Sequence, residues 1–147
     1  MSTQSFIDQL LEYKTFSMQE IQQKFSVSDD QINRNATYTN LTGITEIHNE
    51  ATPGYFYYNE GKFLLFYVGN SKEVRNLKAE ELYERYGGYG EMLTSRAGKI
   101  FMHHVYPEAG IAFSSDGENV RILEVFMPMS LESYKELYYE EPPSYRA

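Results

Sequence analysis

The chain has 147 residues, contains no cysteine and carries a formal net charge of −8 at pH 7. This length fits one domain, the missing cysteine excludes disulfides and thiolate metal sites, and the negative charge argues against general nucleic-acid binding. The first residues show no signal-peptide pattern, and no apolar run reaches the ~18 residues of a membrane helix. We therefore expect a cytoplasmic protein that makes no contact with a membrane.

Two short helices are predicted at the N-terminus. The first has apolar residues at helical spacing, namely Phe6, Ile7, Leu10 and Leu11. The second begins after Ser17, which can cap it, while Glu20 at the third helical position reaches back to complete a capping box. Met18, Ile21 and Phe25 form its apolar stripe.

Strand patterns follow from Asn35 onward. Short strands are predicted at Thr37–Thr39 and Ile44–His48, separated by a turn at Thr42-Gly43. The segments Tyr55–Tyr58 and Lys62–Val68 then alternate around a glycine-containing turn, which is typical of a β-hairpin.

The second half repeats this order of elements. A third helix is predicted from Leu77 to Tyr86, and Gly87-Gly88 ends it as a left-handed C-terminal glycine would. Three strands and a last helix complete the pattern: Ile100–Tyr106, Ile111–Phe113, Val120–Met127, and a helix that begins at Ser130 and ends before Pro142.

These elements predict an α+β fold in which helices pack on one face of an antiparallel sheet. Residues 1–141 form the single domain and residues 142–147 a C-terminal tail. The helix Glu20–Phe25 resembles Glu81–Tyr86 in its pattern, and each is followed by strands and a glycine-turned hairpin. The chain is therefore interpreted as two helix-plus-hairpin units at about 17–69 and 77–127, with chance similarity between two amphipathic helices as the competing explanation.

The hairpin reads Tyr57-x-x-x-Gly61-x-Phe63-x-x-x-Tyr67, and the helix of the second unit ends in the aromatic–glycine pair Tyr86-Gly87. This combination resembles the units of the β-lactamase-inhibitor-protein fold, which the small SmpA/OmlA outer-membrane assembly lipoproteins share. The resemblance covers roughly residues 17–127. It implies a sheet that binds other proteins and supplies no catalytic residues.

Unusual polar residues concentrate in the region 94–106. The candidate binding residues there are Arg96, His103, His104 and Tyr106. Arg96 belongs to a polar loop that can bind an anion in a bidentate manner, and an imidazole titrates near neutrality, which suits acid–base chemistry. Because neighbouring side chains of a strand point to opposite faces, the two histidines cannot chelate one metal in the ordinary way. We predict neither a metal site, nor a cofactor, nor catalytic residues.

Residues 18–35 also resemble a helix-turn-helix, with Ser28 starting the second helix. That helix would open with Asp29-Asp30, whose charge has the wrong sign for contact with phosphates. A helix and turn that pack on the sheet are the simpler interpretation.

The leading hypothesis is a non-enzymatic protein–protein interaction module, such as an assembly factor, adaptor or inhibitor. It would present an aromatic-rich sheet face to a protein partner, since 14 Tyr and 9 Phe make up 16% of the chain. Two alternatives stay open. One is a small-molecule or anion-binding protein, or an enzyme, with a pocket around residues 94–106; the other is DNA binding through residues 18–35. Nothing in the sequence indicates an oligomeric state.

Overall fold

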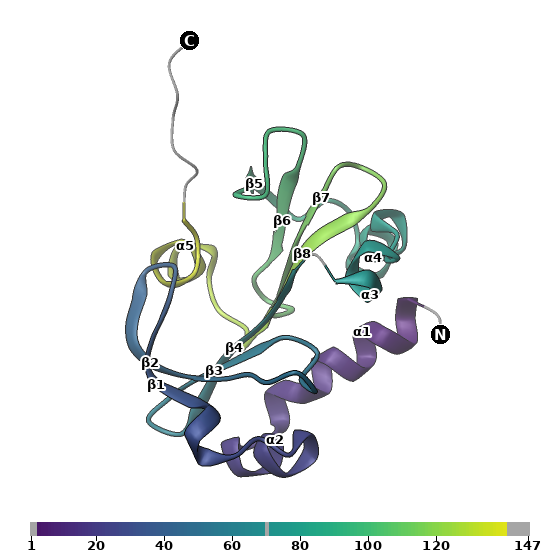
Figure 1. The fold of residues 1–147 in the computed structure, drawn as a ribbon. Coiled ribbons are helices and arrows are strands. Elements are labelled where there is room, and N and C mark those ends of the chain that lie inside the picture. The colour runs from purple at the N-terminus through teal and green to yellow at the C-terminus, as the bar shows by residue number, and fades with distance from the viewer. Residues whose placement is uncertain (1–2, 70, 141–147) are drawn as a thin grey trace.

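The computed structural model describes residues 3–69 and 71–140, and the predicted tail at 142–147 lies outside these residues (Figure 1). The helices are α1 (Thr3–Glu12), α2 (Met18–Phe25), α3 (Lys72–Arg75), α4 (Ala79–Tyr86) and α5 (Leu131–Leu137), with 3-10 turns η1 (Tyr13–Thr15) and η2 (Asp29–Gln31). The strands are β1 (Ile32–Tyr38), β2 (Leu41–Ile47), β3 (Tyr55–Asn59), β4 (Lys62–Gly69), β5 (Glu91–Thr94), β6 (Met102–Tyr106), β7 (Ile111–Ser115) and β8 (Val120–Phe126). The α+β class predicted from the sequence is confirmed.

All eight strands belong to one antiparallel sheet, in the order β1-β2-β3-β4-β8-β7-β6-β5. Each half of the sheet is a meander of four consecutive strands, and a pair of helices precedes each meander. The two halves meet where β4 pairs with β8, from Leu65 opposite Phe126 to Gly69 opposite Ile122.

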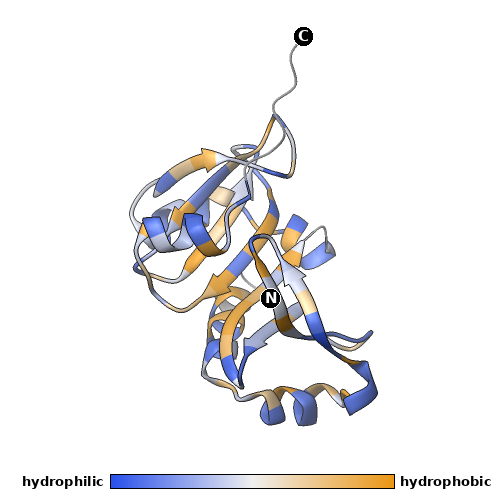
Figure 2. Cartoon of the chain, turned by 90° about the vertical axis from the view of Figure 1, so that its left-hand side faces the viewer, coloured by the Kyte–Doolittle hydropathy of each residue, from blue (hydrophilic) through white to orange (hydrophobic). Residues whose placement is uncertain are grey.

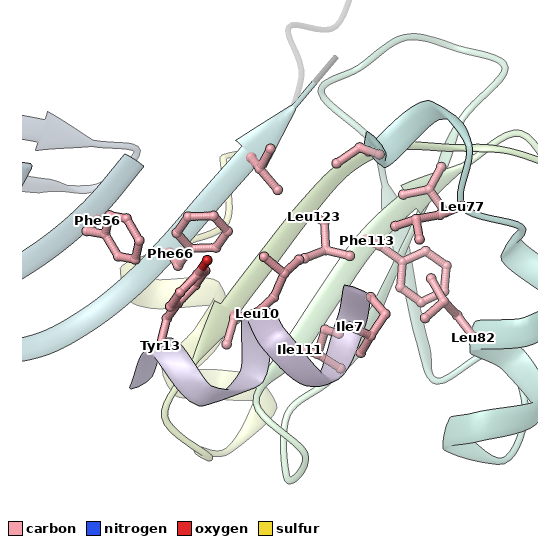
Figure 3. Close-up of a cluster of buried hydrophobic side chains, with 14 of the residues drawn as sticks. Ile7, Leu10, Tyr13, Phe56, Phe66, Leu77, Leu82, Ile111, Phe113 and Leu123 are labelled. Atoms are coloured by element: carbon pink, nitrogen blue, oxygen red, sulfur yellow. The ribbon is translucent and has the colours of Figure 1, made fainter. Parts of the chain in front are cut away.

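Helices α1 to α4 pack on one face of the sheet, where they bury the larger apolar core. Ile7 and Leu10 of α1 lie against this face, and Tyr13 follows them at the end of the helix (Figure 3). The ring of Tyr13 lies 5.1 Å from that of Phe56 and 5.3 Å from that of Phe66. Figure 2 shows mainly hydrophobic residues along the strands through the middle of the molecule. This is expected where other elements cover the faces of a sheet.

The opposite face of the sheet has its own, smaller core, and α5 packs there. Figure 1 shows α5 on the side of the sheet away from α1, α3 and α4. Tyr134 of α5 and Tyr138, which follows the helix, are buried against Phe126, with ring centroids 5.1 and 5.8 Å away. The tip of the β1–β2 hairpin reaches the same helix, because Asn40 Nδ2 donates to the carbonyl oxygens of Glu136 and Tyr139 at 3.0 and 2.8 Å.

Local signals in the sequence predicted several elements correctly. Ser17 caps α2 in a capping box with Glu20, and the hairpin of β3 and β4 turns at the glycine predicted for it. Gly87 ends α4 in the left-handed conformation, at φ 81°. In each case the residues that decide the structure are neighbours in the chain.

One turn was predicted in the wrong place, and two short elements were missed. The turn between β1 and β2 lies at Thr39–Asn40, and Gly43 is inside β2 with a positive φ of 67°. The register of the pair shifts between Ala36 and Tyr38, so the glycine accommodates an irregular stretch of strand instead of a turn. The short elements α3 and β5 were not predicted at all.

Candidate functional site

A buried carboxylate lies at the centre of the face that α5 covers. Glu124 of β8 is only 1% exposed, and burial of an ionised carboxylate is costly unless hydrogen bonds replace its water. Two tyrosine hydroxyls provide them: Tyr38 of β1 donates to Oε2 and Tyr134 of α5 donates to Oε1. The carboxylate thus joins β1 and α5 to the centre of the sheet.

Arg96 approaches this carboxylate from the loop between β5 and β6. Its Nη2 donates to the hydroxyl of Tyr38 at 2.6 Å and lies 3.7 Å from Oε2 of Glu124. The guanidinium also lies over the rings of Tyr38 and Tyr67, at 5.0 and 5.2 Å from their centroids. Although it is engaged in this way, the Arg96 side chain remains 29% exposed and reaches the protein surface.

A chain of hydrogen bonds runs from Glu124 through His103 to the β5–β6 loop. His103 Nε2 lies 2.6 Å from the Tyr134 hydroxyl, and Nδ1 lies 2.8 Å from Oγ of Ser114. Ser114 Oγ is 2.6 Å from Oγ of Ser95, which accepts from the backbone N–H of Ala97 at 2.9 Å.

When His103 is neutral, one assignment of donors and acceptors satisfies every group in this series of hydrogen bonds. Tyr134 gives its only hydrogen to Glu124, so it accepts from the Nε2–H of His103. Nδ1 then accepts from Ser114, and Ser114 accepts from Ser95. We therefore assign the Nε2–H form to the neutral ring.

The charges of this cluster shift the pKa values of its members. Burial alone would raise the pKa of Glu124, but His103, the positive charge of Arg96 and the hydroxyl of Tyr134 outweigh it and lower that pKa below its usual value. Burial and the nearby Glu124 raise the pKa values of Tyr38 and Tyr134 well above that of a free tyrosine. The carboxylate is therefore ionised at neutral pH, and both phenols keep their protons.

The cavity beside these groups has a volume of only about 10 Å³. That is close to the space of a single water molecule. Arg96, His103, Glu124 and Tyr134 line it, and they hydrogen-bond or ion-pair with one another. The described geometry leaves no room for a substrate among them, so the cluster fastens β1, α5 and the β5–β6 loop to the sheet.

A line of half-exposed side chains continues from Arg96 across the same face of the sheet. The ring of Tyr67 on β4 lies 6.2 Å from Tyr55 on β3, which stacks on His48 at 3.9 Å and 14°. We call these four side chains, His48, Tyr55, Tyr67 and Arg96, the aromatic stripe. All of them keep part of their surface exposed.

The four candidate binding residues of the sequence divide between the two faces of the sheet. Arg96 and His103 meet at Glu124. His104 and Tyr106 lie on the other face, near α4. His104 Nε2 is 3.0 Å from the Tyr83 hydroxyl and its Nδ1 is 2.8 Å from the Tyr89 carbonyl oxygen, so Nδ1–H donates to that carbonyl.

Tyr106 and His104 are buried on the face of the sheet that α1 to α4 cover. The hydroxyl of Tyr106 donates to the carbonyl of Gly88 at 2.5 Å, and its ring stacks on Phe113. Burial lowers the pKa of His104; the hydrogen bond to the Tyr89 carbonyl opposes this shift, and the nearby His103 adds to it. The structure does not bring the four residues into one pocket.

The sequence reasoning missed Glu124, Tyr38, Tyr134 and Tyr67. Glu124 did carry a signal, because it is a charged residue in the otherwise apolar run Ile122–Phe126. A charge at an inward position of a strand indicates a buried polar contact. The tyrosines carried no such signal, because 14 of them are spread along the chain.

The helix-turn-helix that residues 18–35 resemble in sequence is not formed. After α2 the chain makes only the 3-10 turn Asp29–Gln31, and β1 begins at Ile32. Gln31 bonds back to the N–H of Ser28 in a second capping box that spans just this turn. There is consequently no second helix to enter a major groove.

Within residues 3–69 and 71–140, no three His, Asp or Glu side chains converge in a way that could hold a metal ion. None of the helices in the described part of the chain has the length and apolar character needed to cross a membrane. No family model, curated protein or solved structure matches the chain.

Proposed function

We propose that the protein is a non-enzymatic interaction module that binds a protein partner through the sheet face bearing the aromatic stripe. The observation that carries the proposal is the unbroken contact from His48 through Tyr55 and Tyr67 to Arg96. These side chains come from separate segments of the chain and remain half-exposed on one face.

The chemistry of the stripe suits a protein interface. Tyrosine and arginine are enriched among residues that dominate binding energy, because each offers a large contact area together with a polar group. Stacking on neighbours already restrains these side chains, and this reduces the entropy lost on binding. The Arg96 guanidinium is fixed by Tyr38 and Glu124, and the side chain is 29% exposed, so a partner can contact it.

The alternative of a small-molecule or anion site at residues 94–106 has less support. The cavity beside Arg96 and His103 has a volume of about 10 Å³, whereas sites for small molecules usually have several hundred. Arg96 and His103 are occupied by protein groups, and His104 and Tyr106 lie on the opposite face.

The cytoplasmic location and the resemblance to the β-lactamase-inhibitor-protein fold stay predictions. The order of a helix pair and four strands, which occurs twice along the chain, supports the resemblance. A protein-binding sheet is what that resemblance implies.

The proposal is tested by affinity capture from the source cell extract with three immobilised proteins. These are the wild type, the double variant Tyr55→Ser/Tyr67→Ser and the control Tyr89→Ser, in which an exposed tyrosine outside the stripe changes. We expect a partner that the wild type and the control retain and the stripe variant loses. Circular dichroism confirms that all three are folded. A partner captured equally by all three, or none captured by the wild type, would overturn the proposal.

A further inference from the structure

A groove with a volume of about 580 Å³ opens at the ends of the strands, beside the β6–β7 turn. It lies between the end of α4, the start of β5, the β6–β7 turn and the segment that leads into α5. It shares no lining residue with the aromatic stripe, so binding in the groove is independent of the proposed function.

The floor and walls of this groove are apolar and aromatic. The rings of Tyr86 and Tyr106 lie 5.0 Å apart at an interplanar angle of 36°. Val105 is buried beneath the groove, and Met129 and Leu131 form the side next to α5. Such surfaces accept an aliphatic chain and leave its end free to reach water.

The charged residues of the groove are all acidic. Glu91 and Glu108 line it, both are exposed, and none of the described lining residues is basic. Two cations lie nearby but do not line the groove: Arg85, whose Nη2 is 2.5 Å from the Asp8 carboxylate, and Lys14, whose Nζ is 3.3 Å from the position that a Cβ on Gly110 would take. The lining of the groove therefore presents a negative charge to solvent, in a chain whose net charge is −8.

We propose that this groove binds an arginine or lysine side chain from a basic segment of a partner protein. The methylene groups would pack between Met129, Leu131 and the tyrosine rings. The cationic head would reach the carboxylates of Glu91 and Glu108, as the pairing of opposite charges favours.

The test is an NMR titration of the whole protein with the peptide acetyl-Arg-Arg-Arg-amide at low salt. We expect the largest shifts at the backbone amides of Glu91, Val105, Glu108 and Leu131. The same peptide with citrulline in place of arginine keeps the shape but loses the charge, and it should cause no saturable shift. Raising the salt concentration should weaken binding of the arginine peptide, because the attraction is between exposed charges.

Two variants that each remove two carboxylates distinguish binding in the groove from a general attraction to the negative charge of the protein. Glu91→Gln/Glu108→Gln removes the two carboxylates of the groove and should weaken binding about tenfold. Glu80→Gln/Glu81→Gln removes two exposed carboxylates of α4 that do not line the groove, and it should leave the affinity within about twofold, as expected for distant surface charges. Equal weakening by both variants, shifts confined to other surfaces, or saturable binding of the citrulline peptide would overturn the proposal.

Discussion

Tyr134 on α5 donates its hydroxyl to the carboxylate of Glu124 on β8, and the two residues are 0% and 1% exposed. The same hydroxyl lies 2.6 Å from Nε2 of His103, so it is the junction between the carboxylate and the imidazole. A helix of seven residues is thereby fixed on the sheet by a buried polar contact in addition to its apolar side.

Replacing Tyr134 by phenylalanine keeps the ring and removes this junction. One carboxylate oxygen then loses its donor and the His103 N–H loses its acceptor, so we expect a loss of about 2–3 kcal/mol in the free energy of unfolding. Urea denaturation at neutral pH measures the change. The control Tyr89→Phe alters a residue that is 59% exposed and should stay within about 0.5 kcal/mol of wild type. Similar losses in both variants would contradict the assigned role.

Acid should destabilise the protein partly through Glu124. Its pKa in the folded state lies below the usual 4.5, so its contribution to stability is complete above that value and disappears as pH falls through the folded-state pKa. We expect the free energy of unfolding to fall more steeply from about pH 5 to 3 in wild type than in Glu124→Gln. Urea denaturation across this range is the measurement. Parallel curves would mean that another carboxylate dominates.

His104 should cause a second pH dependence, nearer to neutrality. Its folded-state pKa is lowered from 6.5, so below 6.5 the unfolded chain binds a proton that the folded protein does not. Stability should therefore decrease as pH falls from about 7.5 to 5.5. In His104→Gln, which keeps a polar side chain beside Tyr83 and the Tyr89 carbonyl, the slope should be smaller. An unchanged slope would assign the dependence to other groups.

Asn40 should stabilise the end of α5 from a distant part of the chain. It donates to the carbonyl oxygen of Glu136 in the last turn of α5 and to that of Tyr139 just after the helix. In Asn40→Ala we expect faster hydrogen exchange of the α5 amides and a loss of about 1 kcal/mol, the usual effect of a lost cap. Asn35→Ala, an exposed change in the same hairpin, should leave α5 exchange as in wild type, and a rise in both would show that the hairpin as a whole loosens.

Two glycines with similar backbone conformations test how closely the β6–β7 turn packs against the backbone of Phe126. Gly110 and Gly61 both have positive φ, at 71° and 80°, so alanine is conformationally strained at each. At Gly110 an added Cβ would collide with the carbonyl oxygen of Phe126, whereas at Gly61 nothing lies within 4 Å. Gly110→Ala should therefore cost at least about 2 kcal/mol more than Gly61→Ala, measured by urea denaturation. Equal costs would mean that the turn moves aside.

Sequence patterns predicted those parts of the fold that neighbouring residues decide. Ser17 and Glu20 fix the start of α2 within one turn, and Gly87 ends α4 by its own conformation. The β1–β2 turn was misplaced because Asn40 is fixed by α5, whose carbonyls follow it by 95 to 99 residues. Strand β5 was missed because it has four residues, three of them exposed, and therefore shows no burial pattern.

The candidate site was predicted only in part for the same physical reason. Arg96 and His103 stood out as unusual polar residues in one segment, and they do meet. Their meeting point, Glu124, follows them by more than twenty residues, and Tyr38 precedes Arg96 by 58. Only the order of strands in the sheet brings such partners together. The alternation of side chains along β6 did separate His103 from His104 correctly.

The junction of β4 with β8 has a consequence for the order in which the chain can fold as it is made. Every other strand pair joins strands that are consecutive in the chain, but β4 can complete its pairing only after β8, the last strand, has been synthesised. Until β8 has left the ribosome, the N-terminal half carries an unpaired edge that includes Leu65, Phe66 and Val68, all buried in the finished protein. An open apolar edge of this kind attracts other chains. We therefore expect synthesis that stalls before residue 120 to yield an aggregation-prone product.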